Sequence, residues 1–254
     1  MNKKEILGSE TAKGGFSNEE EVIGKFNNWK QDKIAQDWLI VMNYKIDEIE
    51  YVRAVKVGGN YKTDVQVQVT IKLKNAIDCE NLSVKLVSNT HGFNQVDKRE
   101  VSKYVQMWNI PKEVEETLKL FTGKTKPKRK RGLKDSRRTL FNEMPEKKQE
   151  KMINFIKKNK ILVISDILKG RDKFSVDWML VILKKNESSY EWALKDINTV
   201  MNIFGQGGIR ITDMGSLKIG KITMQRKGGD AGRESAKMLQ FKINPCLLFD
   251  AKND

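Results

Sequence analysis

The feature that most constrains the fold of this chain is the segment Tyr61–Ser88, YKTDVQVQVTIKLKNAIDCENLSVKLVS. Apolar and polar residues alternate along Asp64–Leu73, and this period of two predicts a strand with one buried face. The polar run Asn75–Asn81 predicts a loop, and Leu82–Val87 predicts a second strand. The segment therefore predicts two neighbouring strands of one sheet.

An acid, a serine and a lysine lie at positions of this strand pair that suggest a catalytic site. Asp64 opens the first strand, and Ser83 and Lys85 lie two apart on the second, so they share a face. A carboxylate that holds Mg²⁺ and a lysine that orients water and offsets phosphate charge are the groups needed to cut a phosphodiester bond. A turn aspartate and an edge-strand lysine explain the same pattern, and spacing alone does not choose between the two.

The charge of the chain favours an anionic partner. There are 48 Lys and Arg residues against 33 Asp and Glu, giving a net charge of +15 and a pI near 9.6. Such an excess points to nucleic acid, although merely basic proteins share it. No long amphipathic basic helix, secretion signal or membrane-spanning run is evident, so we expect a cytoplasmic protein without a membrane partner. The two cysteines fit a reducing compartment.

The single histidine, His91, excludes several enzyme classes within one chain. Nucleases built on paired histidines are excluded, and Cys79 and Cys246 have no partner at zinc-ligand spacing. No Gly-x-Ser-x-Gly turn supports a serine hydrolase. An enzyme of this composition is expected to use carboxylates, a lysine and a hard metal ion.

The remaining periodicity predicts further elements. Helices are expected at 18–26, 30–42, 101–108, 112–121, 146–158 and 192–204, and strands at 49–57, 177–184, 218–225 and 238–243. The run ILVISDIL, residues 161–168, is expected to be a buried strand that leads into a helical turn. Glu19 and Glu20 lie in the first turn of the first helix, where the helix dipole favours acids; the alternative is that one of them is an auxiliary metal ligand.

Three segments carry groups suited to nucleic acid. The predicted loop 88–100 contains Phe93, which could wedge between bases or simply anchor the loop, and Asn94 and Gln95, which could read base edges. The arm Gly123–Arg138 has nine basic residues and one acid, which suits phosphate contact without sequence information. The segment Leu217–Pro245 predicts two strands joined by a glycine-rich basic turn, either a β-ribbon that reads DNA or a plain surface hairpin.

Four segments together resemble the type II restriction endonucleases of the PD-(D/E)XK superfamily: GFSNEEEV, YKTDVQVQV, SVKLVSNTHGFNQVDK and QRKGGDAGRESAKMLQFKINP. The likeness runs from about Ser9 to Phe249 and is greatest to the small enzymes that recognise GCGC and cut after the first G. It implies an α/β fold with a mixed central sheet flanked by helices. It further implies one domain over 1–254, with a catalytic core at about 18–110, the basic loop 123–138 and a scaffold with the reading hairpin at about 145–249.

The resemblance also implies roles for residues. Asp64 matches the metal-binding aspartate and Lys85 the catalytic lysine, while Thr63 replaces the motif's proline and Ser83 stands where an acid or amide is usual. The Val84 carbonyl and Glu19 are the further candidates for holding Mg²⁺, for which Mn²⁺ could substitute. The candidate DNA-binding residues are Phe93, Asn94, Gln95, Lys98, Gln225, Arg226, Lys227, Asp230, Arg233, Gln240 and Lys242.

The implied function is Mg²⁺-dependent cleavage of double-stranded DNA at GCGC, leaving 5′ overhangs, in a restriction–modification system. A palindromic target suits either a homodimer or a monomer that cuts each strand in turn. A cognate methyltransferase would share the target without having to bind this chain. Two alternatives remain open at this point: a DNA-binding protein whose nuclease site has decayed, and a repair nuclease that recognises DNA structure.

Overall fold

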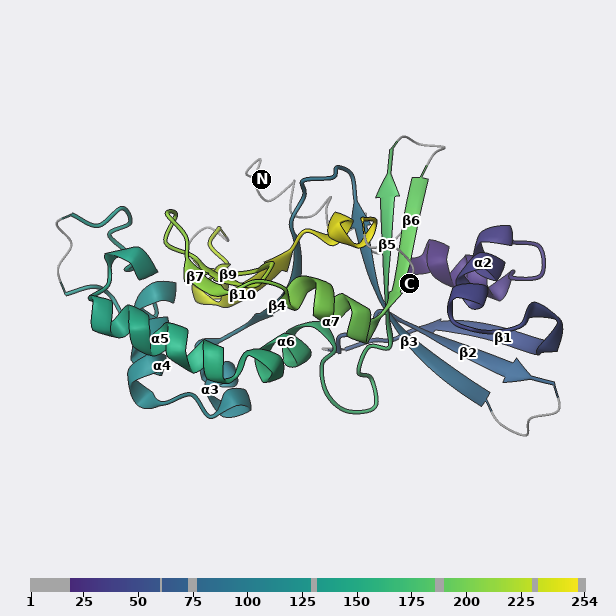
Figure 1. The fold of residues 1–254 in the computed structure, drawn as a ribbon, viewed down its shortest axis with the longest axis horizontal. Helices are drawn as coiled ribbons and strands as arrows, with labels where there is room; N and C mark the ends of the chain where they lie inside the picture. The colour runs from purple at the N-terminus through teal and green to yellow at the C-terminus, as the bar shows by residue number, and fades with distance from the viewer. Residues whose placement is uncertain are drawn as a thin grey trace. The chain divides into compact units, whose positions relative to one another are not determined.

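The chain divides into two compact units, and most of their helices and strands are labelled in Figure 1. The computed structural model describes residues 19–59, 61–72, 77–128, 132–185, 190–229 and 233–250. Unit 1 comprises Met1–Gly92, Leu168–Val200 and Asn244–Asp254, and unit 2 comprises Phe93–Ile167 and Met201–Ile243. The interpretation of 1–254 as one domain with three functional parts stays a prediction.

Unit 1 is built on a mixed five-stranded sheet with the strand order β1-β2-β3-β5-β6. The β3–β5 pair is parallel and the other three pairs are antiparallel. The elements are α2 (Lys33–Val41), η1 (Ile46–Glu48), β1 (Ile49–Lys56), β2 (Val65–Ile71), β3 (Ile77–Val87), β5 (Trp178–Lys184), β6 (Tyr190–Asp196) and η5 (Pro245–Leu248). The predicted meander of β1, β2 and β3 is present in this sheet.

The predicted alternation of β2 places one face of this sheet against a hydrophobic core. Val65, Val67 and Val69 are fully buried, together with Trp38 and Leu39 of α2. The helix begins at Asp32, whose carboxylate accepts hydrogen bonds from two backbone N–H groups of the first turn. The intervening β2 residues point to the opposite face, which is therefore free to carry polar groups.

Unit 2 contains a second, antiparallel sheet with the order β4-β10-β9-β8-β7, whereas a single central sheet was predicted. The strands are β4 (Asn94–Arg99), β7 (Ile209–Ile211), β8 (Leu217–Ile219), β9 (Ile222–Arg226) and β10 (Leu239–Ile243). The helices are α3 (Val101–Trp108), α4 (Lys112–Thr122), η2 (Phe141–Glu143), α5 (Glu146–Lys158), α6 (Lys160–Leu168) and η4 (Glu234–Lys237), while α7 (Ile197–Gly205) runs from unit 1 into unit 2.

One face of the unit 2 sheet is apolar and packs on aromatic side chains. Phe241 of β10 is fully buried, with its ring centroid 5.4 Å from that of Tyr104 and 6.0 Å from that of Trp108, both on α3. The Tyr104 hydroxyl donates to the buried carboxylate of Asp97 on β4, and both burial and this carboxylate raise the pKa of Tyr104. Direct cross-strand partners share a face, so Met224, which pairs with Phe241, lies on this core side too.

Five of the predicted elements differ from the structure. Residues 77–81, predicted as part of a loop, belong to strand β3 because they pair with β2. ILVISDIL forms helix α6 instead of a strand, and residues 190–196, placed largely in a helix, form strand β6 before α7 begins. The strand predicted over 218–225 is two strands, β8 and β9, joined by the two-residue turn Gly220-Lys221. Part of the predicted loop 88–100 is strand β4. In the part of the chain that the structure describes, no helix has the length and apolarity needed to span a bilayer.

Candidate functional site

Three donors of β3 converge on one carboxylate oxygen at the start of β2. Asp64 Oδ2 accepts hydrogen bonds from the Val84 backbone N–H at 2.7 Å, from the Ser83 hydroxyl at 3.2 Å and from the Lys85 ammonium at 3.4 Å. The Asp64 backbone N–H in turn donates to the Leu82 carbonyl at 2.8 Å, which fixes the aspartate beside β3. The structure thus brings together all the predicted catalytic side chains: Asp64, Ser83 and Lys85.

The Lys85 ammonium also donates to the Val84 carbonyl at 3.2 Å. Two hard oxygen atoms, Asp64 Oδ2 and the Val84 carbonyl oxygen, therefore face the same cationic group. Oxygen donors of this type are the ligands that Mg²⁺ prefers. The residues present consequently fit a site in which the protein supplies two oxygen ligands and leaves the remaining positions to water and substrate.

Both departures from the motif are accommodated locally. Thr63, in place of proline, is buried, and its hydroxyl donates to the Phe174 carbonyl at 2.8 Å. Ser83 is 4% exposed, and its hydroxyl is directed at Asp64. A buried hydroxyl without a partner would be unfavourable, so both side chains have a structural role at these positions.

Glu19 is engaged elsewhere in unit 1. Its carboxylate forms an ion pair with Lys56 of β1 at 2.6 Å. Among the described residues no group of three His, Cys, Asp or Glu side chains is arranged to hold a metal ion. The structure therefore offers no acid cluster at Asp64, and a metal role for Glu19 stays a prediction that would require this ion pair to break.

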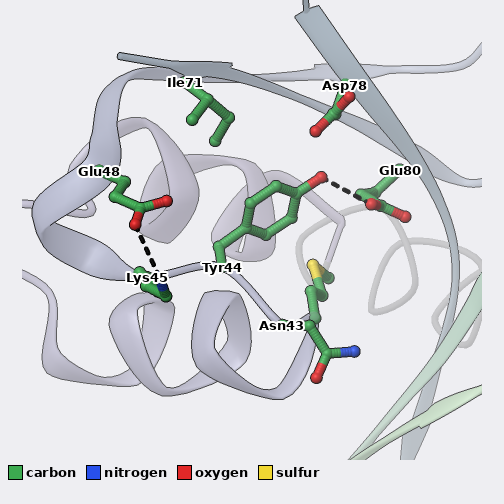
Figure 2. Close-up of a pocket in the computed structure, with 8 residues that line it drawn as sticks. Asn43, Tyr44, Lys45, Glu48, Ile71, Asp78 and Glu80 are labelled. Atoms are coloured by element: carbon green, nitrogen blue, oxygen red, sulfur yellow. Dashed lines mark hydrogen bonds and ion pairs between the residues drawn. The ribbon is translucent and has the colours of Figure 1, made fainter. Parts of the chain in front are cut away.

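A pocket of about 310 Å³ lies beside Tyr44 in the same unit (Figure 2). The Tyr44 hydroxyl donates to Glu80 at 2.7 Å, and Asp78 completes the acidic side of the pocket. Glu80 and Asp78 occupy even positions of β3, whereas Ser83 and Lys85 occupy odd ones, so they lie on opposite faces of the sheet. This pocket is thus separate from the candidate active site.

The face of the unit 2 sheet opposite its aromatic core carries a chain of three glutamine amides. Gln225 of β9 donates to Gln240 of β10 at 3.3 Å, and Gln240 donates to Gln95 of β4 at 2.6 Å. Gln240 also pairs across the strands with Lys98, and Gln95 with Lys242. Five of the predicted DNA-binding residues therefore share one surface, here called the polar face, although they come from three segments of sequence.

The polar face extends further than the sequence predicts. Cross-strand pairing from Lys242 continues to three residues that were not among the predicted DNA-binding residues: Thr223, Lys218 and Arg210. The strands β7 and β8 have three residues each, which is too short for a period of two to be recognised. Only the pairing register reveals that these side chains belong to the same surface.

Arg226 lies on the other side of the sheet from Gln225. It pairs with the buried Leu239, its side chain is 9% exposed, and its Nε has no hydrogen-bond partner. Its guanidinium is 3.9 Å from the Asp135 carboxylate in the basic arm. Burial, followed by the charges of two arginines in the arm, lowers the pKa of Arg226. Because adjacent strand residues face opposite ways, Arg226 and Gln225 do not share a surface.

The Asp135 carboxylate binds arginine side chains at the end of the basic arm. Its carboxylate accepts from Arg137 Nε at 2.8 Å and from Arg138 Nε at 3.2 Å, in addition to the Arg226 contact. The hydrogen bond from Arg137 is the main reason that the pKa of Asp135 falls to about 2. At the start of the arm, Lys124 forms an ion pair with Glu234 at 2.8 Å. The arm is therefore connected to β9 and to the segment that precedes β10.

The remaining predicted DNA-binding residues are distributed around these features. Phe93 is 51% exposed, with the Lys218 ammonium 5.2 Å from its ring centroid, and Asn94 begins β4. Lys227 directly follows β9, and its backbone N–H donates to the Met238 carbonyl, while Arg233 precedes η4. Asp230, and residues 129–131 of the arm, lie outside the described residues.

Comparison with known proteins agrees with this geometry. The family model described as R.HinP1I restriction endonuclease matches residues 42–249. Among solved structures, the restriction endonuclease MspI in complex with its cognate DNA is similar in fold. The TM-score is 0.60 at 14% identity, over 86% of this chain and 80% of that one. No curated protein matches the chain.

The family match spans the candidate active site and the polar face together. The predicted mixed α/β fold, with helices flanking a mixed sheet, is confirmed, and so is the predicted enzyme class. Restriction endonucleases generally use divalent metal ions, in keeping with the two oxygen ligands beside Lys85. The chain belongs to the R.HinP1I restriction endonuclease family and is a type II site-specific deoxyribonuclease.

Proposed function

We propose that this enzyme hydrolyses double-stranded DNA at the palindrome GCGC, after the first G, with Mg²⁺ as its cofactor and with Mn²⁺ as a substitute. The observation that carries the proposal is the convergence of Asp64, Ser83 and Lys85 where β2 begins beside β3. The expected setting is a restriction–modification system, in which a methyltransferase protects the same target in host DNA.

In unit 1, Asp64 and the Val84 carbonyl would hold the metal ion, which supplies an activated water and stabilises negative charge. The three donors to Asp64 Oδ2 fix the orientation of the carboxylate before substrate binds. Lys85 would turn from these oxygens toward the scissile phosphate, where its ammonium offsets the charge of the pentavalent transition state. Ser83 acts through Asp64 as a positioning residue.

In unit 2, the polar face is suited to the edges of bases. An amide carries both a donor and an acceptor, so neighbouring glutamines can donate hydrogen bonds to guanine and accept one from cytosine. Gln240 is 6% exposed and is bonded to both of its neighbours, so we assign it a positioning role. Gln95 and Gln225 at the ends of the amide chain, with Lys98 and Lys242, are the candidates for direct contact.

Double-stranded DNA as the partner is further supported by MspI, which was solved with its cognate DNA. The palindromic target is served by a homodimer or by successive cuts of a monomer. Sedimentation of the chain with and without a GCGC duplex distinguishes the two arrangements.

The test is digestion of a plasmid of known sequence by the wild type and by Lys85→Ala, with Mg²⁺ and with EDTA. We expect discrete fragments that end at GCGC, and no fragments from the variant or in EDTA. Fragments that end at another sequence would support the proposed cleavage chemistry but contradict GCGC as the target. Cleavage that follows DNA structure in place of sequence would favour a repair nuclease, and binding without any cleavage would favour a decayed site.

A further inference from the structure

Two cations of the polar face stand directly opposite each other. Arg210 of β7 pairs with Lys218 of β8, and Lys218 pairs with Thr223 of β9. Like charges at directly opposed positions of antiparallel strands are destabilising. Among the described residues neither side chain forms an ion pair with an acid. The pair is therefore a surface feature that costs stability unless an anion from outside the chain compensates it.

Lys218 is held in place rather than free in solvent. Its ammonium is 5.2 Å from the centroid of the Phe93 ring, within the range of a cation–π contact. Partial burial, with a smaller contribution from the charge of Arg210, lowers the pKa of Lys218. A cation that is desolvated beside another cation binds an incoming anion more strongly than a fully hydrated one, because part of the desolvation cost is already met.

We propose that Arg210 and Lys218 form a binding site for a backbone phosphate of double-stranded DNA. The inference rests on the proposed function and adds a contact that lies outside the base-reading residues.

The spacing between strands sets the distance from the Arg210–Lys218 pair to the three hydrogen-bonded glutamines. Neighbouring strands lie roughly 4.8 Å apart, so β7 is about 14 Å and β8 about 10 Å from β10, which carries Gln240. The major groove of B-DNA is about 12 Å wide. With the glutamines directed into the groove, Arg210 and Lys218 would lie where the flanking sugar–phosphate backbone runs. Phosphate at that position offers the anion that this pair of cations lacks.

The test is binding of a GCGC duplex and of a scrambled duplex over a series of salt concentrations, measured by fluorescence anisotropy in EDTA. In the variant Arg210→Ala/Lys218→Ala, both affinities should fall by the same factor, and the slope of log K against log salt should fall by about 1. The matched control is Lys157→Ala/Lys158→Ala, which removes the same charge from exposed positions of α5 and should leave the slope unchanged.

An unchanged slope in the double variant, or a changed base preference, would overturn the phosphate site while the wild type still discriminates the two duplexes. A wild type that binds neither duplex would overturn the proposed function as well.

Discussion

At the scale of single residues, the Lys85 ammonium contacts the same two oxygen atoms that would hold the metal ion. Its ammonium is 3.4 Å from Asp64 Oδ2 and 3.2 Å from the Val84 carbonyl oxygen. A positive side chain at this point opposes binding of a divalent cation and, in the proposed mechanism, would stabilise the charged transition state. The two effects can be measured separately.

Lys85→Ala should therefore lower the cleavage rate by on the order of 10²–10³-fold, while metal binding becomes tighter or stays the same. The rate comes from single-turnover cleavage, and the affinity from calorimetric titration of the metal into the free protein. Asp64→Asn is the matched comparison, and it should lose both cleavage and metal affinity. Weaker metal binding by Lys85→Ala would show instead that the lysine organises the ligands.

The buried hydroxyl of Thr63 leads to a prediction about the free energy of unfolding. Thr63→Val keeps the shape of the side chain but leaves the Phe174 carbonyl without its donor, so the free energy of unfolding should fall by about 1–3 kcal/mol. Thr63→Ser retains the hydroxyl and serves as the control. Equal unfolding midpoints for valine and wild type would mean that water replaces the hydroxyl.

At the scale of elements, the ion pair between Arg226 and Asp135 predicts coupling of β9 to the basic arm. Arg226→Gln and Asp135→Asn should each lower stability, with a coupling energy of about 0.5–1 kcal/mol in the double variant, measured by chemical unfolding. Base preference should not change in either variant, because Arg226 faces away from the polar face. A loss of guanine preference in Arg226→Gln alone would restore the sequence-based assignment of this arginine as a base reader.

The pH dependence of that coupling follows from Asp135. Its pKa is lowered from 3.8 to about 2, so the carboxylate stabilises the folded protein above its unfolded pKa. This contribution declines as the pH falls from about 4 toward 2. The coupling energy should accordingly be the same at pH 6 and pH 8, and a difference between these two values would point to another titrating group.

The helices and strands also show how much of the structure could be predicted from the sequence alone. The alternation of β2 was sufficient to predict the strand pair, whereas the spacing of Asp64 and Lys85 left a structural role open, and their catalytic role was inferred from the resemblance. The prediction of ILVISDIL as a strand was wrong, because a short apolar run fits a strand or a helix; Val163 and Ile167, one helical turn apart, are both buried. Residues 190–196 form a strand because β5 offers a pairing edge, which is a tertiary effect. Arg210 and Lys218 became visible only through strand register.

At the scale of the whole molecule, the net charge of +15 should act through separate phosphate sites. The basic arm contributes nine cations to this charge, and the Arg210–Lys218 pair contributes two from a different segment. Contacts to different phosphates release counterions independently, so their effects on the salt slope add. Charge dispersed without specific contacts would instead give a slope that depends only on the total number of cations removed.

Replacing Lys128–Arg131 with alanine, beside the control Lys157→Ala/Lys158→Ala, distinguishes these two cases, because only dispersed charge predicts that the control also reduces the slope. The slope of log K against log salt should fall by up to about 0.9 for each phosphate that the arm no longer neutralises, equally for GCGC and scrambled duplexes. Combining this change with Arg210→Ala/Lys218→Ala should give the sum of the two reductions. Cleavage should still occur only at the target if, as we propose, base edges are read from the polar face. A change in sequence preference in the arm variant would show that the arm reads bases, and a combined reduction smaller than the sum would show that both segments bind the same phosphates.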